Sequence, residues 1–83
     1  MKKLTREQVF DIIAQQIDDP QITLNNDSSM ENIEYWDSLV HLGILVALDV
    51  ELDGKAADIK ELARSKSVKE ILNCLNENQL LAD

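Results

Sequence analysis

The sequence predicts an all-α protein, a bundle of four helices with a short third helix and a long loop between the first two. Three segments carry apolar residues at the three- and four-residue intervals of a helix face. Each is preceded by a Ser, Thr or Asp that suits a helix N-cap. Eighty-three residues suffice for one small domain, which we expect to span 1–83, with its core at about 4–76 and a frayed tail at 77–83.

The first helix is predicted over residues 4–17. Thr5 is its expected N-cap, with Gln8 at the spacing of a capping box. The helix should end just before Pro20, because proline disfavours the α conformation in the residue that precedes it. One face carries Val9, Ile12, Ile13 and Ile17, and the opposite face carries Glu7, Asp11, Gln15 and Gln16. We interpret this helix as scaffold.

Residues 18–36 are predicted to form a long polar connection. Ser28 and Glu31 stand at capping-box spacing, which predicts a short helical turn over about 29–33. Trp36, at the end of the connection, is interpreted as a loop anchor against the bundle. The residues expected to pin the loop to the core are Ile22, Leu24, Met30 and Ile33.

The second helix is predicted over 38–52, with Asp37 as its N-cap and Gly54 just beyond its end. Gly43 costs it about 1 kcal/mol of helix propensity relative to alanine. Ser38 would be the first helical residue, beside unpaired backbone N–H groups and the positive end of the helix dipole, a position that suits a phosphate ester. Apolar residues at 39, 42, 45, 46, 48 and 52 cover one broad face, and Val40, Ile44 and Val50 its flanks, so we expect other elements to cover this helix.

A short third helix is predicted over about 57–64, and a longer fourth helix after it. Ser67 is the expected cap of the fourth helix, with Glu70 completing a capping box. Cys74 lies beside the apolar face of this helix and is interpreted as a core or boundary residue rather than a reactive thiol. The inward residues are Ile59, Leu62 and Ala63 in the third helix and Val68, Ile71, Leu72 and Leu75 in the fourth.

The chain is strongly acidic, with 16 Asp and Glu against 8 Lys and Arg and a formal net charge of -8. This balance disfavours nucleic acid and anionic membranes and favours basic partner surfaces, although it also fits an acidity that only aids solubility. A single cysteine excludes an internal disulfide and fits a reducing compartment. The start of the chain has no signal-peptide pattern, and the apolar run 39–52 is too short to span a bilayer, so we expect a cytoplasmic protein.

Ser38 and His41 lie one helical turn apart with Asp37 adjacent, which raises the alternative of a Ser-His-Asp hydrolase. No Gly-x-Ser-x-Gly elbow surrounds the serine, and the chain has no second histidine to act as base. We therefore expect no catalytic residue and interpret His41 as half-exposed. A metal site is not expected either, because the loop around Asp27 lacks the glycine and terminal glutamate of a calcium loop.

The sequence Trp36-Asp37-Ser38-Leu39, opening an apolar helix, resembles acyl carrier proteins of the Trp-Asp-Ser-Leu type. The resemblance covers most of residues 5–76 in element order and loop lengths. It implies a covalent 4′-phosphopantetheine cofactor on Ser38, supported by Asp37 as N-cap, and a chain that acts as a monomer. It implies as partners a phosphopantetheinyl transferase and the loading, condensing or transfer enzymes for acyl or aminoacyl groups. The implied docking residues are Leu39, Val46, Asp49, Glu51 and Asp53.

Some features depart from that family pattern or leave it open. Gly43 and Val50 stand where many carriers of fatty-acid synthesis have acidic residues, so we expect a different choice of partners. Acidic residues late in the second helix favour docking, but a solvated helix end explains them equally well. The residues by themselves fit equally a small acidic helical interaction module without a prosthetic group, and they do not select among fatty acyl, polyketide and aminoacyl cargo. The predicted third helix is also more basic than the family norm, with Lys55, Lys60, Arg64 and Lys66 in and around it.

Overall fold

The structure, a computed structural model, describes residues 3–18 and 23–82. Within these ranges the chain forms four α-helices, and β structure is limited to isolated bridges. The predicted all-α class and short third helix are confirmed. No helix in the described part of the chain is long and apolar enough to cross a membrane. The helices are α1 (Arg6–Ile17), α2 (Ser38–Glu51), α3 (Lys60–Arg64) and α4 (Val68–Glu77).

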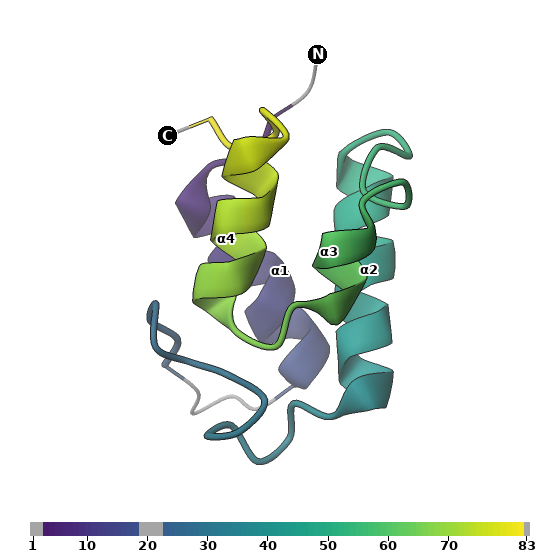
Figure 1. Ribbon diagram of the computed structural model, residues 1–83. Coiled ribbons are helices and arrows are strands. Elements are labelled where there is room, and N and C mark those ends of the chain that lie inside the picture. Colours follow the sequence, from purple (N-terminus) through teal and green to yellow (C-terminus); the bar gives the residue numbers. More distant parts are fainter. Residues whose placement is uncertain (1–2, 19–22, 83) are drawn as a thin grey trace.

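The helices form a bundle in which α1 packs against both α2 and α4. The short α3 bridges the front of the bundle, since it contacts α2 on one side and α4 on the other (Figure 1). The loop that leads into α2 crosses the lower end of the bundle, and the described part of the chain begins and ends at the upper end (Figure 1). The start of α2 and the end of α3 therefore face the same lower region.

The core draws apolar side chains from every helix and from the segments between them. The predicted face of α4 is buried in full, and Cys74 is buried beside it. Trp36 is only 1% exposed, so its predicted role as an anchor is confirmed. Burial of so many large side chains supplies the main stabilisation of a chain this small. The largest fully buried side chains are Trp36, Ile13, Ile44, Leu48, Leu52, Leu62, Ile71, Leu75, Val9 and Val68.

The predicted capping box of α1 is confirmed. Thr5 Oγ1 accepts a hydrogen bond from the backbone N–H of Gln8 at 3.1 Å, and Gln8 Oε1 accepts from the N–H of Thr5 at 2.9 Å. The helix begins at Arg6 rather than at residue 4, because Leu4 is extended and pairs with the chain end. It stops at Asp18, which takes a left-handed conformation with φ 56°.

The prediction for the buried face of α2 is correct only in part: Leu48 and Leu52 are buried as expected, but other residues of that face are exposed. The helix buries His41, Ile44 and Leu48, and Leu52 just beyond its end is also buried. Leu39, expected on the buried face, is instead 77% exposed. Because apolar residues surround this helix, its sequence does not mark one buried face, and the positions of α1, α3 and α4 decide which side is covered. Four apolar side chains of α2 remain exposed: Leu39, Leu42, Val46 and Val50.

The loop before α2 is fixed to the connection between α3 and α4. The N–H of Met30 donates to the carbonyl of Lys66 at 2.8 Å, and the N–H of Val68 donates to the carbonyl of Ser28 at 2.9 Å. Three of the predicted anchors, Leu24, Met30 and Ile33, pack against the core as expected, and Ile22 lies outside the described residues.

The turn inside this loop forms with different partners from those predicted. Ser29, not Ser28, begins the turn: its N–H donates to Asn32 Oδ1 at 2.9 Å, and its carbonyl accepts from the N–H of Ile33 at 2.9 Å. Ser28 is buried, and its hydroxyl accepts from the N–H of Asn25 at 3.0 Å. The pairing predicted from sequence was therefore one residue out of register.

The α3 segment is shorter than predicted, starting at Lys60 instead of residue 57. Ile59 and Leu62 are buried as expected, but Ala63 is exposed and Ala56 takes its place in the core. At the start of α4, Ser67 caps the helix as predicted. The Glu70 carboxylate reaches one residue further back than a capping box requires and accepts from the N–H of Lys66 at 2.8 Å.

The end of the chain is docked against the start, unlike the frayed tail expected from sequence. Leu80 and Leu81 are buried. The N–H of Leu4 donates to the carbonyl of Leu80 at 2.9 Å, and the N–H of Ala82 donates to the carbonyl of Leu4 at 2.7 Å. Gln79 adopts a left-handed conformation, φ 61°, that turns the chain back onto the core after α4. The core therefore extends beyond residue 76.

Candidate functional site

Ser38 is the first residue of α2, and its side chain is exposed. Asp37 caps the helix as predicted: Asp37 Oδ1 accepts from the N–H of Val40 at 2.9 Å, and its carbonyl accepts from the N–H of His41 at 2.9 Å. Among the described residues, no partner satisfies the N–H groups of Ser38 and Leu39. An exposed hydroxyl thus stands beside two free donors at the positive end of a 14-residue helix.

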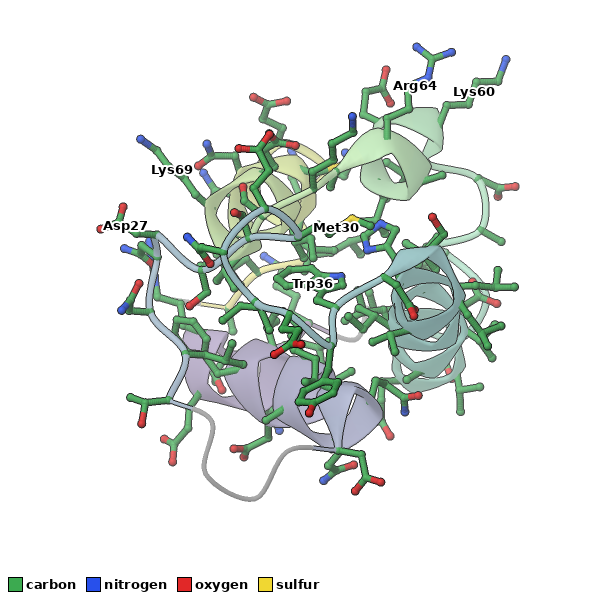
Figure 2. All side chains as sticks on the ribbon, turned by 90° about the horizontal axis from the view of Figure 1, so that it is seen from below. Asp27, Met30, Trp36, Lys60, Arg64 and Lys69 are labelled. Carbon is green, nitrogen blue, oxygen red and sulfur yellow. The ribbon has the colours of Figure 1, made fainter. Side chains whose placement is uncertain are left out.

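The residue before the cap is held by a buried hydrogen bond. Trp36 Nε1 donates to His41 Nδ1 at 3.3 Å, and the two rings stack with centroids 6.0 Å apart. His41 is 6% exposed, so the expectation of a half-exposed histidine is wrong. Trp36 lies at the centre of the lower end of the bundle (Figure 2). The helix start that carries Ser38 is therefore fixed from below by Trp36 and from within α2 by His41.

Burial sets the protonation of this histidine. Desolvation lowers the pKa of His41 below its ordinary value of 6.5, and the backbone of Leu62 and Ala63 in α3 opposes part of that shift. Because Nδ1 accepts from Trp36, the neutral ring carries its proton on Nε2. Nε2 is buried and has no hydrogen-bond partner among the described residues. His41 is thus a neutral core side chain at neutral pH.

A hollow of about 400 Å³ opens beside Ser38, between the start of α2 and the end of α3. Its floor is apolar, and Arg64 and Lys66 form one wall. Neither cation has an ion pair within the described ranges, and both side chains are exposed. The complete lining is Met30, Ser38, His41, Leu42, Leu45, Ala63, Arg64, Ser65 and Lys66.

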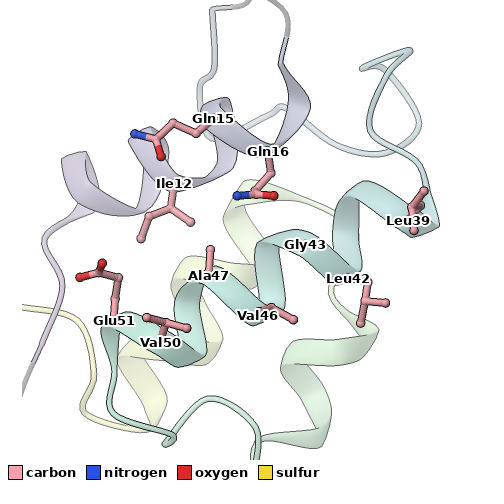
Figure 3. Close-up of a pocket in the computed structure, with 10 residues that line it drawn as sticks. All are labelled: Ile12, Gln15, Gln16, Leu39, Leu42, Gly43, Val46, Ala47, Val50 and Glu51. Carbon is pink, nitrogen blue, oxygen red and sulfur yellow. The ribbon is translucent and has the colours of Figure 1, made fainter.

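A second groove, of about 600 Å³, runs along α2 on the side facing α1 (Figure 3). Its α2 wall is formed by exposed apolar side chains, which we call the α2 stripe: Leu39, Leu42, Val46 and Val50, each 56% to 77% exposed. Its α1 wall consists of Ile12, Gln15 and Gln16. Gln16 is half-buried over Gly43, so the expectation that it faces away from the core is wrong. The stripe begins next to Ser38.

The three acidic residues predicted for docking lie in different settings. Asp49 is half-buried, and its Oδ1 accepts from the N–H of Ala57 at 2.8 Å, which fixes the loop before α3. Glu51 lies at the far end of the groove against α1. Asp53 is exposed in a left-handed conformation, φ 55°, where Gly54 with φ 86° completes the predicted helix stop. Leu39 and Val46 belong to the α2 stripe.

The hydrolase arrangement is not assembled in this structure. His41 Nδ1 accepts a hydrogen bond from Trp36, and His41 Nε2 is buried without a partner among the described residues. Within the same residues, no hydrogen bond joins the imidazole ring to Ser38. Cys74 is buried, and desolvation with the nearby Glu61 and Glu77 raises the pKa of its thiol above the ordinary 9.0. Among the described residues, no group of three His, Cys, Asp or Glu side chains is arranged to hold a metal ion.

Comparison with protein-family models found no match, and comparisons with curated proteins and with solved structures found none either. The geometry of the site therefore carries the functional argument. Sequence reasoning missed four contributors to the site: Leu42 and Val50 in the stripe, and Arg64 and Lys66 beside Ser38. The excess of apolar residues around α2 was the sequence signal that could have identified the missed stripe residues. The two cations carry no such signal, because only the packing of α3 brings them next to Ser38.

Proposed function

We propose that the chain is a carrier protein of the acyl-carrier type, whose Ser38 hydroxyl bears 4′-phosphopantetheine. The observation that supports this proposal is the setting of Ser38, an exposed serine at the head of a capped helix with two free N–H groups beside it. The order of the helices, the long first loop and the short α3 agree with that fold. When bound, the group supplies a flexible arm whose thiol holds acyl or aminoacyl groups as thioesters.

The residues around Ser38 fit such a group. A phosphodiester on the serine oxygen would lie next to the free N–H groups of Ser38 and Leu39, where the helix dipole favours negative charge. Arg64 and Lys66, in the wall of the adjoining hollow, add positive charge. The hollow also provides an apolar floor, of which Met30 and Leu45 are part, beside the point of attachment.

In this proposal the chain performs no chemistry itself. It tethers the cargo, which raises the effective concentration of the acyl group at each enzyme that docks. The Trp36–His41 hydrogen bond keeps the head of α2 rigid, so that Ser38 is presented in one orientation. A reduced thiol arm persists in the cytoplasm, and we place the protein there.

The α2 stripe is the proposed docking surface for the phosphopantetheinyl transferase and for the loading, condensing or transfer enzymes. Exposed apolar side chains in a row are uncommon on a small monomer unless another molecule covers them. Because the stripe begins beside Ser38, an enzyme docked on it would lie close to the arm. Asp53 is exposed just beyond the opposite end of the helix, where basic residues of a partner would meet it.

The test is the intact mass of the chain after incubation with coenzyme A and a broad-specificity phosphopantetheinyl transferase. We expect the wild type and a Ser29→Ala control to gain one phosphopantetheine, and Ser38→Ala to gain none. If the wild type gains nothing while the same transferase modifies a reference carrier, the carrier proposal is wrong.

The α2 stripe also favours a second candidate, a small helical interaction module without a prosthetic group. Such a module needs an exposed apolar face but no modified serine. The mass experiment separates the two, because only a carrier gains mass at Ser38.

A further inference from the structure

Positive charge is unevenly placed in this acidic chain. Five of the eight Lys and Arg residues lie between residues 55 and 69. Four of them, which we call the basic rim, surround α3: Lys60, Arg64, Lys66 and Lys69. Lys60 and Arg64 project outward from α3, and Lys69 projects from α4 (Figure 2). All four are exposed, and none forms an ion pair within residues 3–18 and 23–82.

Arg64 also lines a separate hollow between α3 and α4, together with Glu61, Glu70 and Glu77. Glu61 and Glu70 lie in the same part of the chain but line neither hollow between α2 and α3. The Glu70 carboxylate already accepts from the backbone of Lys66. Asp49, which lines the upper hollow, accepts from the N–H of Ala57. The lining of the lower hollow itself therefore contains two cations and no carboxylate.

The surface between α2 and α3 combines this charge with an apolar floor. The lower hollow, beside Ser38, places Leu42 and Leu45 opposite Arg64 and Lys66. The upper hollow, of about 180 Å³, continues along α2 with Leu45, Val46 and Ala63 in its lining. On the other side of the stripe, the α1 wall presents the uncharged amides of Gln15 and Gln16. The stripe thus has Arg64 and Lys66 at its lower end toward α3, whereas the charged residue that lines the groove toward α1 is Glu51.

From this asymmetry we propose that the α2–α3 surface binds an acidic amphipathic helix of a partner protein. Its apolar side covers Leu42, Leu45 and Ala63, and its carboxylates face Arg64 and Lys66. An arginine fork binds carboxylates in a bidentate manner, which fixes the register of such a helix. The net charge of -8 repels an acidic segment from the rest of the chain, so the basic rim also selects where it docks. The unmodified chain presents this surface, so the proposal does not depend on modification of Ser38.

The experiment is a selection from a phage-displayed library of random peptides about four helical turns long, with the unmodified full chain as bait. Selected peptides are mapped by amide chemical shifts in 15N-labelled protein, and their affinities are measured by calorimetry. The charge-reversed variant is Arg64→Glu with Lys66→Glu. A milder variant, Arg64→Gln with Lys66→Gln, keeps the test valid if reversal disturbs α3. Lys3→Glu is the control, because Lys3 is exposed and adjoins Leu4, which pairs with Leu81 after the end of α4.

We expect the selected peptides to be enriched in Asp and Glu beside apolar residues, and to shift amides of Leu42, Leu45 and Ala63. The charge-reversed variant should bind these peptides about tenfold more weakly than the wild type, and the neutralised variant should lose less affinity. Lys3→Glu should change the affinity by less than about twofold. The proposal is overturned if the peptides are basic, if they shift amides of α1 instead, or if the double reversal leaves affinity unchanged. Binding to phosphatidylserine vesicles that the reversal abolishes would assign the cations to a membrane surface and would also overturn it. None of these results depends on whether the mass experiment finds phosphopantetheine on Ser38.

Discussion

Trp36 and His41 form one hydrogen-bonded, stacked pair that joins the long loop to α2. The indole N–H donates to Nδ1 of the imidazole at 3.3 Å, and both side chains are almost fully buried. Protonation of His41 must place a proton on Nδ1, which removes the acceptor that Trp36 uses. The charge of this histidine is thus coupled to the anchoring of the residue two positions before Ser38.

We predict that stability falls as the pH is lowered through the range just below 6.5. The folded pKa of His41 is lowered by burial, so between that pKa and 6.5 the unfolded state binds more protons and acid favours unfolding. Above pH 6.5, the contribution of neutral, buried His41 to the free energy of unfolding is fully present. The measurement is urea unfolding, followed by Trp36 fluorescence, from about pH 7.5 to about pH 5.5. His41→Leu should flatten the dependence in this window, and an equal slope in that variant would contradict the assignment.

Gly43→Ala is predicted to be neutral or stabilising by up to about 1 kcal/mol. A Cβ at this position would lie 2.6 Å from Gln16 Oε1, the end of a flexible side chain that can rotate away. The gain in helix propensity then remains. Chemical unfolding of the variant measures the net change in the free energy of unfolding, which includes both the helix propensity and the contact with Gln16. A loss of more than about 1 kcal/mol would mean that Gln16 is fixed in place, and Gly43→Ala with Gln16→Ala should then recover it.

A matched pair of leucine truncations tests the docked chain end. Leu80→Ala should cost about 2–4 kcal/mol of the free energy of unfolding, because Leu80 is 3% exposed. Leu39→Ala, the same change at a 77% exposed position, should cost less than about 0.5 kcal/mol. Thermal and urea unfolding of both variants give the comparison. Equal effects would show that the chain end does not pack as described.

If the chain is a carrier as proposed, Leu39→Ala and Val46→Ala should slow the loading of Ser38 by a phosphopantetheinyl transferase. Both side chains belong to the α2 stripe and contribute little to folding, so truncation removes docking area without unfolding the chain. The expected result is a loss of about threefold to tenfold in kcat/KM for each variant. The control variant is Ala82→Ser, at an exposed position away from the stripe. Val68→Ala would not serve as a control, because Val68 is buried and its truncation would destabilise the fold. Unchanged kinetics in both stripe variants would exclude the stripe as the transferase surface.

Asp49→Ala is predicted to cost about 1 kcal/mol of stability, because the N–H of Ala57 loses its acceptor. Asp58→Ala, an exposed aspartate in the same loop, serves as the control. Hydrogen exchange at Ala57 should accelerate in the first variant only. No change in exchange or stability would mean that this hydrogen bond does not stabilise the loop before α3.

Much of the local structure follows from the sequence. The N-caps at Thr5, Asp37 and Ser67 were predicted, because a side chain that satisfies a nearby backbone N–H acts over three residues and needs no tertiary context. The buried face of α4 was also predicted, since its apolar residues form a single stripe. The position of Ser38 at the head of α2 follows from the same local rules.

Only the tertiary structure decided which side of α2 is buried. Apolar residues surround that helix, so its pattern permits several faces, and the packing of its neighbours selected Ile44 and Leu48 for the core while leaving Leu39 exposed. Long-range contacts also bring Arg64 beside Ser38 and dock Leu80 against the start of the chain. Caps depend on neighbours in sequence, whereas the exposed stripe and the cations at its lower end depend on contacts between segments far apart in the chain.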